Sequence, residues 1–143
     1  MKGTRSFAAL ALAGALVAGP TVGAGAAAPT AKVRVTLVEF KVLPSPAAVP
    51  AGKVTFAGKV TFVVKDAGKL SHEFVVLKTP KPAAKLPVNG MTAVETGRIG
   101  KIPTFGPGQA RTLTLTLTRG HYVLICNLPG HYKAGQFVDF TVR

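Results

Sequence analysis

Apolar and polar residues alternate along much of the chain, with the two-residue period that places successive side chains on opposite faces of a β-strand. The clearest example is 111–118, in which three leucines alternate with threonines. Residues 32–40 alternate in the same way and place Val33, Val35 and Leu37 on one face. Alternation or runs of β-branched residues predict four more strands, at 60–65, 71–77, 122–126 and 137–142.

Prolines separate these segments. Pro44, Pro46 and Pro50 predict an irregular connection after the first strand, because proline cannot donate a hydrogen bond into a β-ladder. Residues 79–108 contain five prolines, and we expect mostly loop there, with short extended pieces. No segment after residue 28 shows a helical period. About seven short strands with proline-rich turns predict an all-β fold, an antiparallel Greek-key β-sandwich or barrel.

A six-residue sequence occurs twice in tandem, at 51–56 and again at 57–62. Because six is an even number, moving a strand by one copy leaves the same residues facing inward. We expect one copy in the central β-ladder. The other would form a longer hairpin or a looped-out bulge, with no part in a functional site.

The first 28 residues have the three parts of a secretory signal peptide. Residues 1–6 are basic, 7–19 form an apolar stretch too short to span a bilayer as a helix, and 24–28 are small residues. We expect a signal peptide over 1–28 with cleavage near Ala28, and one domain over 29–143. The protein would then be periplasmic or secreted. An uncleaved membrane anchor is the alternative interpretation.

The chain is strongly basic, with 18 Lys and Arg against 5 Asp and Glu and a net charge of +13. Without Lys2 and Arg5 the net charge is still +11. Export and the scattered positions of the basic residues argue against nucleic acid as a partner. They favour acidic docking surfaces on other proteins, or peripheral contact with an anionic membrane. The alternative is that the charge only keeps a monomeric protein soluble.

The only cysteine, Cys126, cannot form an internal disulfide, and a free thiol is a liability in an oxidising compartment unless something occupies or buries it. Cys126 ends a predicted strand, and a Pro-Gly turn follows that can bring His131 back beside the sulfur. His72 lies on an earlier strand. Gln136 follows five residues after His131.

A thiolate and two imidazoles, with a weak axial Met, Gln or backbone oxygen, form the electron-transfer site of blue copper proteins. The sulfur favours Cu(I), and imidazole serves both oxidation states. We therefore predict one copper ion, cycling between Cu(I) and Cu(II), held by His72, Cys126, His131 and Gln136. The same Cys and two His could also bind zinc, but copper binds more tightly where both metals compete.

The spacing Cys126-x4-His131-x4-Gln136, with His72 upstream, resembles that of the cupredoxins, the family of plastocyanin and azurin. The resemblance covers the whole segment 29–143 and implies a one-electron carrier. Two positions depart from it. Gln136 stands where most such relatives carry Met, although stellacyanin-like phytocyanins, which have a disulfide, use Gln. Glu73 stands where many relatives have an Asn whose hydrogen bonds hold the metal-binding loop in place. The sequence therefore does not show which residue has this role here.

We therefore predict an electron carrier between redox proteins, not an enzyme. A copper chaperone or resistance protein is the alternative, although this chain lacks the Met- or His-rich tracts typical of one. Thiol catalysis would need a base aligned with Cys126, and no acidic residue to orient such a base is evident. His121 falls on the opposite strand face from Cys126 and is expected to be exposed. Tyr132 and the Leu128-Pro129 pair are expected to pack around the copper loop and to form an apolar patch where His131 reaches the surface.

Overall fold

The computed structural model describes residues 3, 30–49 and 57–143. The predicted signal peptide therefore lies outside the described residues, apart from Gly3, and so does the first copy of the repeat. Among the residues described, no helix is long and apolar enough to cross a membrane.

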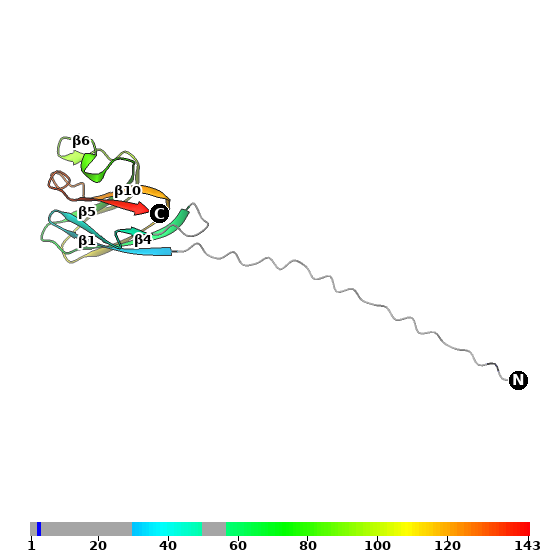
Figure 1. The fold of residues 1–143 in the computed structure, drawn as a ribbon. Coiled ribbons are helices and arrows are strands. Elements are labelled where there is room, and N and C mark those ends of the chain that lie inside the picture. The colour runs from blue at the N-terminus through cyan, green and yellow to red at the C-terminus, as the bar shows by residue number, and fades with distance from the viewer. Residues whose placement is uncertain (1–2, 4–29, 50–56) are drawn as a thin grey trace.

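Two β-sheets form two layers (Figure 1). The four-stranded sheet consists of β1 (Thr30–Val38), β2 (Lys41–Ser45), β4 (Ala57–Asp66) and β9 (Ala110–Thr118), in the order β2-β1-β4-β9. The five-stranded sheet consists of β3 (Ala48–Val49), β5 (His72–Lys78), β8 (Arg98–Phe105), β10 (Gly120–Ile125) and β11 (Phe137–Val142), in the order β3-β11-β10-β5-β8. The predicted all-β sandwich is confirmed. Two strand pairs, β1 with β4 and β11 with β3, are parallel, and the other pairs of the two sheets are antiparallel.

The two sheets pack face to face around one hydrophobic core. The predicted inward residues of β1, which are Val33, Val35 and Leu37, are all buried there. Phe62 of β4 packs across the interface against Phe74 and Phe140 of the other sheet, with ring centroids 5.4 Å and 5.6 Å apart. Aromatic contacts of this kind stabilise the packing of the two sheets beyond the area that they bury.

The outer face of the five-stranded sheet is also covered. Val75, Leu77, Val123 and Ile125 point away from the first core and form a second buried cluster with Ala83, Leu86, Ala93 and Tyr132. Several of these come from the segment after β5, which carries the short helix η1 (Ala83–Lys85) and the two-stranded sheet of β6 (Val88–Asn89) and β7 (Thr92–Ala93). In Figure 1 this segment lies on the outer side of β5 and β10. Burial on both faces makes β5 apolar at consecutive positions, so its alternation is weak.

Two strands occupy segments that the prolines predicted to be irregular. These are β2, which contains Pro44, and β8, which contains Pro103. Each is the edge strand of its sheet. An edge strand pairs on one side only, so the missing N–H of a proline can face away from the ladder. The prediction of an irregular connection at Pro44 was therefore wrong, whereas β8 is one of the extended pieces expected within 79–108, longer than predicted.

The second copy of the repeat lies in the first part of β4, between the parallel strand β1 and the antiparallel strand β9. Its Phe62 and Val60 are buried in the main core. One copy in the central ladder is what the sequence predicts.

Candidate metal centre

Three of the predicted ligands come together at one end of the sandwich. One ligand atom from each of His72, Cys126 and His131 lies within 4.8 Å of the others. The Cys126 Sγ is 3.8 Å from the Nδ1 of His72 and 3.4 Å from the Nδ1 of His131. His72 begins β5 and Cys126 directly follows β10, its neighbour in the sheet, so strand pairing brings these two side chains together.

His131 reaches the group through a tight loop between β10 and β11. Its N–H donates to the Leu128 carbonyl at 2.9 Å, which closes the turn, and the turn passes through Gly130 at a φ of 85°. Side chains other than glycine rarely adopt this left-handed conformation. Two backbone hydrogen bonds involving Gln136 close the loop: its carbonyl accepts from Cys126 at 3.0 Å, and its N–H donates to His131 at 3.1 Å.

Gln136, the fourth predicted ligand, is fully buried beside both imidazoles. Its amide Oε1 lies 2.9 Å from the Nδ1 of His131, and its Nε2 lies 3.0 Å from the Nδ1 of His72. The Nε2 group also donates to the Val38 carbonyl at 3.0 Å, which anchors the amide to the end of β1. The side chain is thus placed to reach a metal bound at the two Nδ1 atoms, and its role as axial ligand remains a prediction.

The thiol of Cys126 lies in the interior and accepts a hydrogen bond from the Glu73 N–H at 3.3 Å. Burial raises the pKa of this thiol, so the free protein holds its proton more tightly than an exposed cysteine would. A metal that binds sulfur must displace that proton. A soft thiolate beside two imidazoles fits copper, in either oxidation state, better than it fits a hard cation.

Comparison with known proteins connects this site to named relatives. No family model matches the chain. Rusticyanin of Acidithiobacillus ferrooxidans is 30% identical over 95 residues, which are 66% of this chain and 48% of rusticyanin. The chain thus spans about half the length of the curated relatives it matches.

Solved structures show the same fold. Rusticyanin from Thiobacillus ferrooxidans superposes with a TM-score of 0.57 and 21% identity, covering 80% of this chain and 77% of that one. Reduced auracyanin from Roseiflexus castenholzii gives a TM-score of 0.55 at 21% identity, covering 82% and 99%. Both proteins are cupredoxins, and this chain combines their fold with a Cys/His/His cluster. These findings support the predicted resemblance to the cupredoxin family.

The residue that braces the metal loop, which the sequence left unassigned, is Asn127, directly after Cys126. The Asn127 Nδ2 donates to the Glu95 Oε1 at 2.9 Å. Glu95 in turn pairs with Arg98 at 2.7 Å and with Lys101 at 3.6 Å, and Lys101 pairs with the buried Glu73 at 2.9 Å. The network therefore connects the residue after Cys126 with the residue after His72.

The remaining residues that the sequence singled out lie elsewhere. His121 is not part of the cluster: its Nδ1 lies 2.6 Å from the Thr79 carbonyl and its Nε2 lies 2.8 Å from Asp139. Its side chain is 31% exposed, less than expected. Tyr132 is buried in the second cluster, with its hydroxyl donating to the Ala83 carbonyl at 2.7 Å, so the prediction that it joins a surface patch was wrong.

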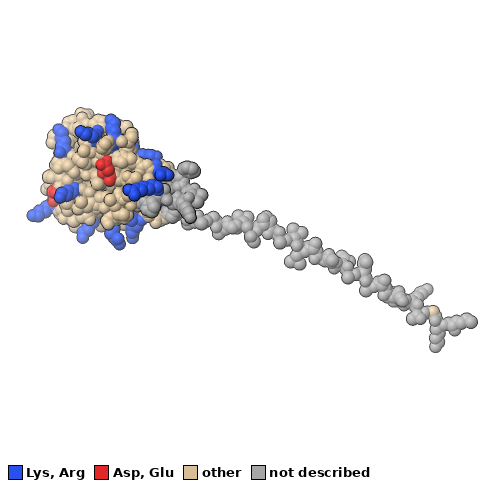
Figure 2. All heavy atoms as spheres, in the orientation of Figure 1, with Lys and Arg blue, Asp and Glu red and all other residues tan. Residues whose placement is uncertain are grey.

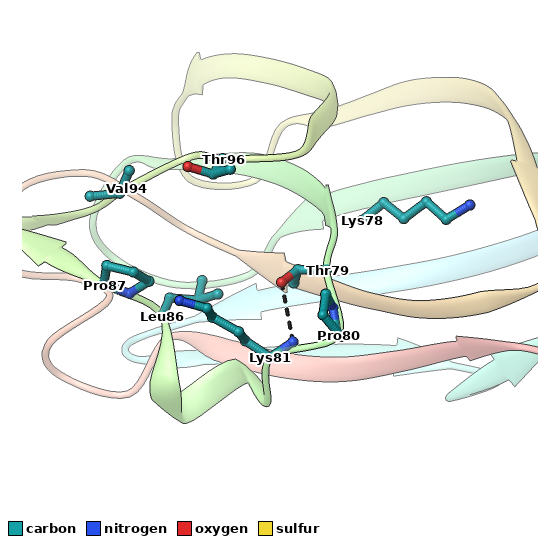
Figure 3. Close-up of a pocket in the computed structure, with 8 residues that line it drawn as sticks. All are labelled: Lys78, Thr79, Pro80, Lys81, Leu86, Pro87, Val94 and Thr96. Carbon is teal, nitrogen blue, oxygen red and sulfur yellow. Dashed lines mark hydrogen bonds between the residues drawn. The ribbon is translucent and has the colours of Figure 1, made fainter.

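A pocket of about 260 Å³ opens where the chain leaves β5 (Figure 3). None of the four predicted ligands lines it. The lining residues are Lys78, Thr79, Pro80, Lys81, Leu86, Pro87, Val94 and Thr96. The pocket is therefore separate from the candidate metal centre.

Proposed function

We propose that this protein is a one-electron carrier that holds one copper ion through His72, Cys126 and His131, with Gln136 as the axial ligand. The observation that carries the proposal is the convergence of one sulfur and two imidazole nitrogens within 4.8 Å of one another. When bound there, copper would supply the Cu(II)/Cu(I) couple, taking one electron from a donor protein and passing one to an acceptor.

The protein's part is to hold the ligands in one geometry for both oxidation states. Cys126 and His72 are fixed at the ends of neighbouring strands, and two backbone hydrogen bonds close the loop that carries His131. A frame of this kind limits rearrangement when the charge changes, which favours fast electron transfer. It also supports a carrier over an enzyme, because no step of chemistry on a substrate is required of these residues.

The electron would leave through His131, the one member of the Cys/His/His group that is not fully buried. The exposed ring of Phe40 packs edge-on against His131, with centroids 5.3 Å apart. The exposed side chain of Met91 lies against Gly130, the residue before His131. We infer that a redox partner docks on this apolar surface, defined by Phe40, Gly130, His131 and Met91.

The charge of the protein supports acidic partners. With a net charge of +11 once Lys2 and Arg5 are removed, the protein would attract acidic redox proteins, and could rest on an anionic membrane surface. Lys and Arg side chains are distributed widely over the face shown in Figure 2. We propose that the protein works as a monomer outside the cytoplasm, after the signal peptide at 1–28 is removed. Mass spectrometry of the mature N-terminus tests the cleavage.

The experiment that tests the function is to purify the protein expressed from the full chain, add Cu(II), and record visible absorption and electron paramagnetic resonance. Cys126→Ser removes the sulfur, and His121→Gln is the matched control outside the cluster. We expect an intense thiolate–copper band that is absent in Cys126→Ser and unchanged in His121→Gln. A colourless protein that binds only Cu(I) would instead indicate a copper chaperone or resistance protein, and no binding would refute both.

A further inference from the structure

The second ring nitrogen of His72 faces two carboxylates. While its Nδ1 faces Cys126, its Nε2 lies 3.6 Å from the Glu39 Oε1 and 3.9 Å from the Asp66 Oδ1. His72 is fully buried, and its Nε2 has no hydrogen-bond partner among the described residues. A buried ring nitrogen without a partner is costly, so its surroundings call for an explanation.

Asp66, the last residue of β4, is fully buried as well. Its Oδ1 accepts a hydrogen bond from the Gly68 N–H at 2.9 Å. Its backbone is fixed on both sides, because its N–H donates to Gln109 and its carbonyl accepts from Gly108. The Oδ2 has no partner within the part of the chain that the structure describes. The Asp66 Oδ2 and the His72 Nε2 are thus two buried atoms that lack partners among the described residues, and the two groups approach each other to 3.9 Å through Oδ1, which indicates that they interact.

Glu39 approaches the same nitrogen from the turn between β1 and β2. Its Oε1 accepts hydrogen bonds from the N–H groups of Lys69 at 2.5 Å and Leu70 at 2.6 Å. Gly68 leaves room for the carboxyl group: a Cβ at this position would lie 2.9 Å from the Glu39 Cδ. The loop after β4 therefore holds the Glu39 carboxylate against the imidazole of His72.

We propose that Glu39 and Asp66 are positioning residues for the copper site, acting through the Nε2–H of His72. The proposal rests on the proposed function. A histidine that binds a metal through one nitrogen usually donates the other N–H to a carboxylate, a carbonyl or water. The distances of 3.6 Å and 3.9 Å exceed a hydrogen bond, so a small movement or a bridging water completes the contact. A proton held on Nε2 leaves the lone pair of Nδ1 directed toward Cys126.

The same two carboxylates bear on the reduction potential. Cu(II) carries one more positive charge than Cu(I), and negative charge in a poorly solvated site favours the more positive state. Glu39 and Asp66 would therefore lower the potential of the couple. Neutral variants should raise it, and the effect should exceed that of removing an equal charge elsewhere.

The test uses Glu39→Gln, Asp66→Asn and the double variant, with Asp139→Asn as the matched control, since Asp139 is exposed and contacts His121 rather than His72. For each protein, voltammetry gives the reduction potential and competition titrations give the Cu(II) and Cu(I) binding constants. We expect the ratio of Cu(II) to Cu(I) binding constants to fall by about three- to tenfold per carboxylate, where tenfold is about 59 mV for one electron. Gly68→Ala, which keeps every charge but displaces Glu39, should shift the potential in the same direction.

A second measurement needs no copper. Nitrogen-15 NMR of the copper-free protein reports which ring nitrogen of His72 carries the proton. We expect the Nε2–H form in the wild type and a shift toward the Nδ1–H form in the double variant, with His131 unchanged. The result distinguishes a proton-holding role from a merely structural one.

The outcomes separate the two proposals. If the wild type shows the thiolate–copper band but the potentials of both single variants match that of Asp139→Asn, the inference about Glu39 and Asp66 is overturned. If Asp66→Asn does not fold, Glu39→Gln alone decides, because Glu39 lies at the surface of a turn. If the wild type binds no copper, the proposed function fails, and the NMR measurement still decides whether the carboxylates hold the His72 proton.

Discussion

Asn127 satisfies both backbone polar groups of Ala93. Its Oδ1 accepts from the Ala93 N–H at 2.7 Å, and its Nδ2 donates to the Ala93 carbonyl at 2.9 Å. The residue next to Cys126 thus pairs with β7 as another strand would. This contact ties the cysteine end of the metal loop to the segment that covers the five-stranded sheet.

Replacing Asn127 by Ala should destabilise the copper-free protein. Asn127 is buried, and the change leaves the buried Ala93 N–H without a partner, which costs about 1–3 kcal/mol. Urea unfolding followed by circular dichroism measures the loss, and the exposed Asn89→Ala is the control. Equal stabilities of the two variants would contradict the bracing role.

Glu95 should make the stability depend on pH in the acid range. Burial alone would raise the pKa of the Glu95 carboxyl, but hydrogen bonds from Asn127 and Arg98 outweigh it and hold that pKa below its ordinary value. The folded protein then binds this proton less readily than the unfolded chain. The contribution of Glu95 is therefore present above the ordinary pKa of a glutamate and is lost as the pH falls through the lowered one.

Glu95→Gln should therefore flatten the acid limb of the stability curve. Unfolding free energies of the copper-free wild type and variant, measured between about pH 6 and pH 3, should converge as the pH falls. Curves that stay parallel over this range would show that Glu95 does not contribute through its charge.

Gln136→Met should raise the reduction potential of the copper-loaded protein. A carboxamide oxygen is harder than a thioether and stabilises Cu(II) better, so the wild type should have the lower potential. Voltammetry of both proteins measures the difference, with Gln109→Met as an exposed control. A wild-type potential equal to or higher than that of Gln136→Met would argue against Gln136 as the axial ligand.

Deletion of one repeat copy should leave copper binding intact. Removing 51–56 or 57–62 produces the same sequence, so the single remaining copy can supply the strand residues that β1 and β9 pair with. We expect the thiolate–copper band at wild-type intensity, measured by visible titration. Loss of copper binding would mean that both copies are needed to build the site.

The central strands could be predicted from the sequence because alternation directly reflects one buried and one exposed face. The alternation of apolar and polar residues correctly predicted β1 and β9, whose leucines and valines face the core. It failed for β2 and β8, because Pro44 and Pro103 are compatible with a strand only at a sheet edge, and edge position is a property of the assembled sheet.

The candidate site likewise has one part that the sequence predicted and one part that it did not. Cys126, His131 and Gln136 lie within one short loop, so their spacing alone predicted that they come together. The partners of His72 could not be predicted, because Glu39 is distant in sequence, and the spacing of Asp66, six residues before His72, is not typical of a metal site. Asn127 and Glu95 were missed for the same reason: their contact exists only after the outer segment folds over the sheet.

The prolines of the two edge strands also affect how the folded molecules meet one another. An exposed sheet edge can template a strand from a second molecule, which is a common start of aggregation. In β2 and β8 a proline removes one of the N–H donors that such a strand would need, and Lys41 places positive charge on β2. Edge-to-edge association is thus opposed at one edge of each sheet.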